Sequence, residues 1–248
     1  MKKILLVLFC LLSIVVLPEE KKNTFNSSNY IICIDPGHQT KGNNELEPIA
    51  PNSKQKKAKV TTGTRGVATK KYESELMLEI GLKLKDSLEK KGYKVIMTRT
   101  INDVNISNVE RSLFANKNKA TLYIRLHADG SENKNIYGAS TLTSSPKNKY
   151  TEKTQKESEK FSKILLEEYV KSTGAKNRGV IYRDDLTGTN WAEVTNTLIE
   201  LGFMSNKEED KKLSDEKYQE KIIDGLVNGI EKYLKSNWWK EFKLWVYI

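Results

Sequence analysis

Short apolar runs that end in turn residues alternate with longer amphipathic stretches along this chain. Residues 30–34 (YIICI) are rich in β-branched side chains and are followed by an Asp-Pro-Gly turn, which predicts a buried strand. Apolar residues then recur at helical spacing from Met77 to Leu88, and Gly92 ends the pattern. Such alternation is typical of parallel sheets covered by helices. The sequence therefore predicts an α/β fold, in which a single domain has a central, mostly parallel, twisted sheet flanked by helices on both faces.

The alternation continues towards the C-terminus. Ser107 and Glu110 match a capping box, which predicts the start of a short helix that reaches Ala115. Further strands are predicted at residues 93–98, 121–126, 138–142, 180–183 and 196–201. Further helices are predicted at residues 152–173 and 215–234. The polar residues 39–71 are too many for a structureless connection, so they predict a functional loop or a short strand around residues 66–68.

Charge and composition narrow the class of protein. The chain of 248 residues is 38% apolar and 30% charged, which fits one soluble domain with terminal extensions. Its net charge of +10 indicates an anionic partner, and nucleic acid, an anionic membrane surface or a bacterial wall would each satisfy this condition. The sequence contains no zinc-finger spacing, no RNA-recognition signature and no aromatic-basic stacking run, which disfavours nucleic acid.

Residues 1–20 have the composition of an export segment. Two lysines precede an apolar run over residues 4–17, which has the length of a signal-peptide core and is short for a membrane span of about 20 residues. No small-x-small cleavage site follows, so we expect a signal peptide or a retained N-terminal anchor, and then a polar linker at residues 21–29. Cys33 would be the one cysteine left after export, and its apolar surroundings predict a small buried side chain.

The chain contains two histidines, His38 and His127. Each comes after a predicted buried strand, either directly or after a short turn. Because functional groups gather at the carboxyl ends of strands in open parallel sheets, we expect both imidazoles at the same edge. A lone histidine in such a place is more often structural. Two histidines in the same role favour a shared metal ion, for which imidazole is a common ligand.

Two imidazoles bind zinc weakly, so a third ligand is required. Glu73 and Glu75 are the candidates, although the dipole of the predicted helix also favours carboxylates at its start. Spacing alone does not choose between them. Two nitrogens and one carboxylate would leave a position for water, as in catalytic zinc sites.

Glu200 lies within the otherwise apolar run at residues 196–201. A carboxylate there requires a physical reason, because burying it without a partner is costly. Partial desolvation would raise its pKa, which suits a group that takes and returns a proton. The alternative is an outward orientation or a hidden salt bridge.

Five segments occur in a fixed order along the chain: IDPGH (34–38), ESELMLEIGLKLKDSLEKKGYKVIMTR (73–99), ERSLFAN (110–116), RLHAD (125–129) and IELGFMSN (199–206). On these motifs the chain resembles the zinc-dependent N-acetylmuramoyl-L-alanine amidases of the amidase-3 family. The resemblance extends from about residue 30 to residue 235. One motif alone would be a weak signal, whereas five in order are highly specific.

The resemblance implies that residues 30–235 are a zinc amidase catalytic domain. It implies that Zn²⁺ is bound by His38, Glu73 and His127, with the first of the two glutamates preferred by its offset within the motif. It also implies that Glu200 is the catalytic residue. The expected reaction is hydrolysis of the amide between N-acetylmuramic acid and L-alanine in peptidoglycan, by zinc-activated water, in a secreted, wall-associated enzyme.

The chain departs from the family pattern at residues 39–41, where the family often has glycines, and in the length of the segment that follows. These differences leave the metal ligands intact and put the shape of the substrate groove in question. Arg125 and Asp129 flank the second histidine and are candidates for supporting or substrate contacts, with a solvated or salt-bridged role as the alternative. Arg99 and Arg111 are predicted to be structural ion-pair partners.

Two other functions are compatible with these residues: a zinc peptidase that acts on stem peptides, and a non-catalytic wall-binding protein with a vestigial metal site. The order of the motifs argues against the first, and the presence of Glu200 argues against the second. Expected partners are peptidoglycan, anionic wall polymers and a protein activator, with membrane contact only through an uncleaved N-terminal segment. The aromatic tail at residues 236–248 has no assigned role.

Overall fold

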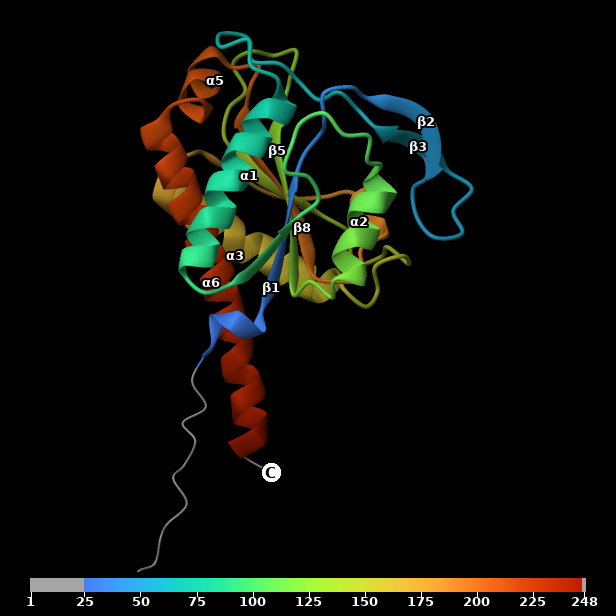
Figure 1. Cartoon of the computed structure of the whole chain (residues 1–248), viewed down its shortest axis with the longest axis vertical. Coiled ribbons are helices and arrows are strands. Elements are labelled where there is room, and N and C mark those ends of the chain that lie inside the picture. The colour runs from blue at the N-terminus through green and yellow to red at the C-terminus, as the bar shows by residue number, and fades with distance from the viewer. Residues whose placement is uncertain (1–24, 247–248) are drawn as a thin grey trace, which may run out of the picture.

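The computed structural model describes residues 25–246, with side chains for residues 25–238, and its centre is a six-stranded sheet (Figure 1). The strand order is β4-β1-β5-β8-β6-β7. The strands are β1 (Ile31–Pro36), β4 (Lys94–Met97), β5 (Leu122–Asp129), β6 (Ala139–Thr143), β7 (Asn177–Tyr182) and β8 (Asn196–Phe203). The first four in spatial order are parallel, whereas β6 is antiparallel to β8. The predicted, mostly parallel sheet is confirmed.

Helices cover both faces of the sheet, as predicted. They are α1 (Glu73–Lys90), α2 (Asn108–Lys117), α3 (Gln155–Thr173), α4 (Thr187–Asn190), α5 (Lys207–Leu213) and α6 (Glu216–Val246), with a short 3₁₀ turn, η1 (Ser27–Asn29), before β1. Helices α1 and α3 both pack on α6, and all three cover one face of the sheet. Helices α2 and α4 lie together on the other face, and Figure 1 shows α1 and α2 on opposite sides of β1.

The period-2 alternation of the strands produces two unequal cores. Ile32 and Ile34 of β1 pack into the large core under α1, α3 and α6. Cys33 and Tyr123 point to the other side, into a small cluster near α2 and α4. Cys33 is buried, as predicted, and burial together with the nearby charge of Asp35 raises the pKa of its thiol. The small core leaves room for polar side chains on the α2 face of the sheet.

The long segment after β1 holds a hairpin that its sequence did not reveal. Strands β2 (Asn43–Pro48) and β3 (Lys56–Val60) pair antiparallel and reach over the α2 side of the sheet in Figure 1. Both strands are mostly polar, with β2 half exposed and β3 mostly half-buried, so they lack the apolar alternation that identifies a strand. Asn108 Nδ2 donates to Lys59 O at 2.7 Å and joins the hairpin to α2.

The prediction of a short strand around residues 66–68 is wrong. This segment is a turn, in which Gly66 N donates to Lys71 O at 2.9 Å. Ala68 N and Thr69 N both donate to the Asp210 carboxylate, at 2.7 and 2.8 Å. The turn is therefore held by α5 rather than by a neighbouring strand.

Helix α6 begins where the closing helix was predicted and continues to Val246, past the predicted boundary at residue 235. Near that end, the Phe25 ring stacks on Tyr30 and meets Trp238 edge-on, with ring centroids 5.2 and 6.4 Å apart. None of the helices in the described part of the chain is both long and apolar enough to cross a membrane. The predicted export segment, residues 1–20, lies outside the described residues.

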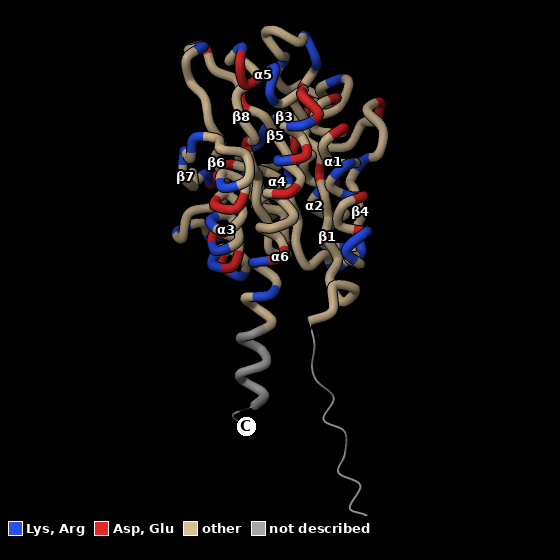
Figure 2. Tube along the Cα trace, turned by 90° about the vertical axis from the view of Figure 1, so that its left-hand side faces the viewer, with Lys and Arg blue, Asp and Glu red and all other residues tan. Residues whose placement is uncertain are grey.

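Lys and Arg alternate with Asp and Glu along the tube in Figure 2, for example on α3. Several of these charges are paired on the surface, such as Lys163 with Glu159 in α3. The basic residues that give the chain its net charge of +10 are therefore interspersed with acidic residues in this view of the molecule.

Candidate metal centre

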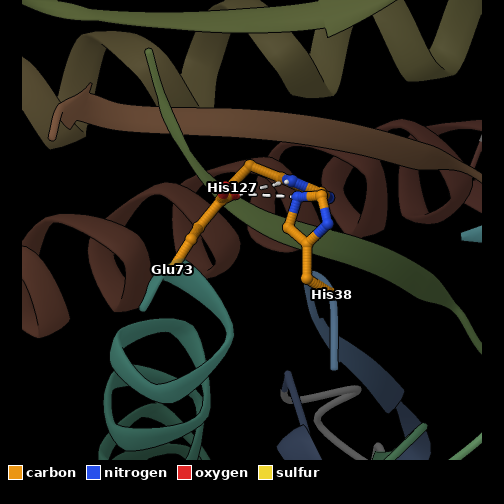
Figure 3. A group of neighbouring side chains, drawn as sticks. All are labelled: His38, Glu73 and His127. Carbon is orange, nitrogen blue, oxygen red and sulfur yellow. Dashed lines mark hydrogen bonds and ion pairs between the residues drawn. The ribbon is translucent and has the colours of Figure 1, made fainter. Parts of the chain in front are cut away.

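Three side chains from separate elements converge at the carboxyl end of the sheet (Figure 3). His38 follows the end of β1, Glu73 is the first residue of α1, and His127 lies in β5. Glu73 Oε1 lies 3.1 Å from His38 Nε2 and 3.1 Å from His127 Nδ1. One potential ligand atom from each residue lies within 4.8 Å of the other two. The structure thus brings together the three residues that the sequence predicted as metal ligands.

Hydrogen bonds from the surrounding backbone orient this group. His38 Nδ1 lies 2.7 Å from the carbonyl oxygen of Thr61, to which it can donate, and this contact turns Nε2 towards Glu73. Glu73 Oε2 accepts from Thr64 N at 2.8 Å, and Glu73 Oε1 accepts from Ala128 N at 3.2 Å. Such outer contacts fix ring tautomers and carboxylate orientation around metal sites.

The charge state of the group fits a divalent metal. Burial by itself raises the pKa of Glu73, but the hydrogen bonds and charges of His127 and His38 outweigh it and hold that pKa below its usual range. Burial lowers the pKa of His127 to about 4, which makes the ring neutral at pH 7. His127 Nε2 is buried and has no hydrogen-bond partner among the described residues. A neutral His127 ring and an ionised Glu73 carboxylate are forms in which such groups bind zinc.

The loop before α1 closes around the cluster. Gly63 has φ of +82°, and a Cβ there would lie 2.7 Å from the His38 ring and 2.8 Å from Glu73 Oε2. His38 itself has φ of 69°, a conformation that is uncommon for a side chain of its size. Strained backbone of this kind persists where the surrounding structure holds a functional side chain in place.

Glu200 lies next to the cluster on β8, where its Cα is paired with that of His127. Alternation along β8 directs Leu198 and Glu200 to the α2 face, while Ile199 and Leu201 enter the large core. Oε2 of Glu200 is buried without a hydrogen-bond partner among the described residues. Burial raises the pKa of Glu200 well above its usual value, and the charges of Glu73 and Asp129 add to this shift. The predicted general base is therefore close to the candidate ligands and not salt-bridged.

A cavity of about 450 Å³ opens beside the cluster on the α2 face. His38 and His127 form part of its wall, and the remaining wall comes from β3 and Thr61 after it, from α2, β5 and β8, and from the segment that leads from β7 into α4. Strand β3 of the hairpin and Thr61 of the loop after it therefore line this cavity.

Asp35 is a buried hub that sequence reasoning did not identify. Arg111 Nη1 donates to its Oδ1 at 2.7 Å, and Arg125 Nε donates to its Oδ2 at 2.9 Å. Thr98 and Tyr123 donate their hydroxyls to the same carboxylate. The ion pair predicted for Arg111 is confirmed. The signal that could have revealed this hub was a charged residue directly after the apolar run at residues 30–34.

Arg99 and Asp129, for which the sequence also predicted roles, have different surroundings. Arg99 forms no salt bridge in the described part of the chain. It donates to the carbonyl oxygens of Pro36, Gly37 and Ser74, so the predicted ion pair is wrong. Asp129 accepts from Gly130 N at 2.7 Å, and burial raises its pKa.

The sequence and fold were compared with known proteins. The family model described as N-acetylmuramoyl-L-alanine amidase (Amidase_3) matches residues 32–232. The germination-specific N-acetylmuramoyl-L-alanine amidase of Bacillus subtilis is 27% identical over 187 residues, which are 67% of this chain and 73% of that protein. The chain spans about half the length of the longer AmiC amidases of Neisseria meningitidis and Escherichia coli that it also matches, at 54% and 48%.

Solved amidases share the fold. An N-acetylmuramyl-L-alanine amidase of Mycobacterium smegmatis superposes with a TM-score of 0.77 at 24% identity, covering 86% of this chain and 100% of the other. The CwlD amidase of Clostridioides difficile, solved in complex with the GerS lipoprotein, has a TM-score of 0.67 at 27% identity, covering 84% and 100%. The chain therefore belongs to the N-acetylmuramoyl-L-alanine amidase family, hydrolases of the amide that joins N-acetylmuramic acid to L-alanine in peptidoglycan.

Proposed function

We propose that this chain cuts the muramoyl–L-alanine amide with a zinc ion held by His38, Glu73 and His127. The observation that carries the proposal is the convergence of two imidazole nitrogens and one carboxylate oxygen within 4.8 Å. Two nitrogens and one oxygen are a donor set of catalytic zinc, which keeps a position for water or substrate. A zinc ion bound there supplies Lewis-acid polarisation of the amide carbonyl and a lower pKa for water.

In this proposal Glu200 moves the proton. It takes a proton from the attacking water and delivers it to the L-alanine nitrogen as the carbon–nitrogen bond breaks. The products are a lactyl carboxylate on the sugar and a free amino group on L-alanine. A carboxyl whose pKa is raised by burial suits both halves of this transfer, and its unpartnered Oε2 is available for it.

Other residues of the chain hold the reacting groups in position. The Thr61 carbonyl keeps the proton of His38 on Nδ1, and the amide of Thr64 keeps the Glu73 carboxylate turned towards both histidines. These contacts are made before substrate arrives, so little reorganisation is needed during the reaction.

Action on peptidoglycan requires the enzyme to work outside the cytoplasmic membrane. Residues 1–20 are proposed to direct this export, as a cleaved signal peptide or as a retained anchor. The net charge of +10 would favour contact with anionic wall polymers. Because the similar Clostridioides difficile amidase was solved with a lipoprotein, a protein activator is part of the proposal.

The test is digestion of purified peptidoglycan by the full chain, with and without a chelator, beside Glu200→Gln. Mass spectrometry identifies the ends that are released. We expect new L-alanine amino termini that disappear with chelator. We expect Glu200→Gln to keep its zinc, measured by metal analysis, and to lose activity by about 10²- to 10⁴-fold, the usual contribution of a positioned acid–base group.

Two results would contradict the proposal. Release of new termini between amino acids would identify a stem-peptide peptidase. A folded, zinc-loaded chain that binds the wall and cuts nothing, even with candidate activators present, would identify a wall-binding protein. Undiminished activity of zinc-loaded Glu200→Gln would remove the role assigned to that residue alone.

A further inference from the structure

The cavity beside the metal cluster carries more positive than negative charge. Lys57, Arg125 and Arg183 line it, and Asp185 is the acidic residue among its lining residues. Asp185 accepts from Arg183 Nε at 2.7 Å and from Arg183 Nη2 at 2.9 Å, and it also pairs with the Lys57 ammonium. One carboxylate is thus shared by two cations at the rim of the cavity.

A similar excess of positive charge occurs at Asp35, which is bonded to the cavity-lining Arg125. Asp35 is shared by the guanidinium groups of Arg111 and Arg125, which are 1% and 4% exposed. Two buried guanidinium groups share one carboxylate, so the groups that are salt-bridged at this hub have a surplus of one positive charge among the described residues. Buried charge is costly unless it is paired, so this surplus favours an anion in the adjoining cavity.

Arg125 connects the hub to the cavity. Its Nε donates to Asp35 and its Nη2 donates to Asn108 Oδ1 at 2.6 Å, while Arg125 also lines the cavity. Gly188 of α4 lies against the guanidinium, because a Cβ there would be 2.3 Å from Nη1. A larger side chain at that position would displace the guanidinium. The Arg125 guanidinium is therefore fixed in place by its neighbours rather than free to move on the surface.

The two sides of the scissile amide differ in charge. The glycan side consists of neutral acetylated sugars, whose lactyl carboxyl is consumed in the amide. The peptide side carries carboxyl groups, and the nearest belongs to the D-glutamate that follows L-alanine. The D-glutamate is linked to the next residue of the stem peptide through its side-chain carboxyl, so its α-carboxyl is either free or amidated. A cationic cavity next to the cluster matches the peptide side.

We propose that this cavity is the subsite for the stem peptide, and that Arg125, Lys57 and Arg183 bind the free α-carboxylate of the residue after L-alanine. The inference rests on the proposed function, because it assumes that the amide lies at the His38–Glu73–His127 cluster. Arg125 supplies the buried donor, since a guanidinium is suited to planar carboxylates. Lys57 and Arg183 supply charge at the rim. The chain thus distinguishes free from amidated peptidoglycan.

The first arm of the test compares two substrates of the zinc-loaded full chain: N-acetylmuramoyl-L-alanyl-D-glutamate, with a free α-carboxyl, and its isoglutamine counterpart. We expect kcat/KM to favour the free acid by about tenfold or more, the factor expected for a hydrogen bond to a charged group. Lys57→Gln and Arg183→Gln should each reduce this ratio. Lys59→Gln is the matched control, since its ammonium pairs with Glu45 on the same hairpin and does not line the cavity.

Arg125→Lys tests the buried donor. It keeps the charge beside Asp35 and removes the planar fork, so the ratio should fall while the melting temperature confirms that the chain is folded. Equal cleavage of both substrates by the unsubstituted chain would overturn the inference and leave the proposed function standing. A ratio that Lys59→Gln lowers as much as Lys57→Gln would show a general charge effect and also overturn it.

The second arm measures binding without catalysis. The dipeptide with D-glutamate joined through its side chain, its isoglutamine form and glycerol 3-phosphate are titrated calorimetrically into the zinc-loaded chain. Tighter binding of the free-acid dipeptide, by about tenfold, supports the inference even if neither substrate is cut, an outcome that would count against the proposed function alone. Tighter binding of glycerol 3-phosphate would assign the cavity to phosphate-bearing wall polymers instead and overturn the inference.

Discussion

Glu73 and Glu75 lie two residues apart at the start of α1 and have different surroundings. Glu73 is 3% exposed and faces both histidines. The Glu75 carboxylate turns back and accepts from Tyr72 N at 3.0 Å, as in a capping box. The choice between these residues, which spacing left open, corresponds to a difference between a buried cluster and a helix cap.

A pair of alanine variants separates the two roles. We expect Glu73→Ala to lose most of its bound zinc, because one of three ligands is removed. Glu75→Ala should keep stoichiometric zinc and lose about 0.3–1.5 kcal/mol of unfolding free energy, the usual contribution of a helix cap. Metal analysis and urea unfolding measure these quantities. Zinc loss in Glu75→Ala with full occupancy in Glu73→Ala would reverse the assignment.

At the scale of elements, the loop between β3 and α1 holds the residues of the candidate metal centre in position. It supplies the Thr61 carbonyl and the Thr64 amide, and it passes the cluster at Gly63 with a left-handed φ of +82°. Gly174, at the end of α3, has a similar φ of +71°, but no atom lies within 4 Å of the position that a Cβ would take there. The two glycines share a backbone conformation and differ in how close their neighbours lie.

Comparing Gly63→Ala with Gly174→Ala therefore isolates the effect of a Cβ that lies close to His38 and Glu73. Both should lose about 1–2 kcal/mol of unfolding free energy, because alanine is disfavoured at positive φ. Only Gly63→Ala should also weaken zinc binding, since its Cβ would displace His38 or Glu73. Zinc affinity measured by competition with a chelator provides the test. Equal affinities in the two variants would show that the loop does not hold the ligands as described.

At the scale of the whole molecule, Asp35 of β1 joins β5, α2 and Thr98, the residue after β4, on the α2 face. Burial raises its pKa, but the charges of Arg111 and Arg125 and the bond from Thr98 outweigh this and place the pKa well below the ordinary value of 3.8. Because the folded pKa is depressed, Asp35 stabilises the fold above the ordinary pKa. This stability is lost as the pH falls below 3.8 towards the folded pKa.

Asp35→Asn tests this linkage. At pH 7 it should lose about 3–5 kcal/mol of unfolding free energy, because two buried guanidinium groups lose their carboxylate. The difference from the unsubstituted chain should shrink by about 1 kcal/mol at pH 3, since only the unsubstituted chain loses the contribution of an ionised Asp35. Urea unfolding at both pH values measures it, with the exposed Glu45→Gln as control. A difference that grows in acid would contradict the depressed pKa.

Much of this protein was determined by local sequence. The apolar runs in β1, β5 and β8 alternate or cluster as buried strands do, and Ser107 with Glu110 forms the predicted capping box, with Glu110 N donating to Ser107 Oγ at 3.1 Å. Strand and helix periods depend on neighbours a few residues away, so they are readable without a fold. The types of the candidate ligands were readable for the same reason, since their chemistry belongs to single side chains.

Only the tertiary structure decided how distant residues share their charges and space. The hairpin β2–β3 has no apolar period, and its position depends on contacts such as Asn108 with Lys59, 49 residues apart. The sharing of Asp35 by Arg111 and Arg125 joins residues 76 and 90 positions apart. Such pairings depend on which strands become neighbours in the sheet, a long-range outcome of packing that no local pattern contains. The cationic cavity, and hence the selectivity inferred for it, exists only through that arrangement.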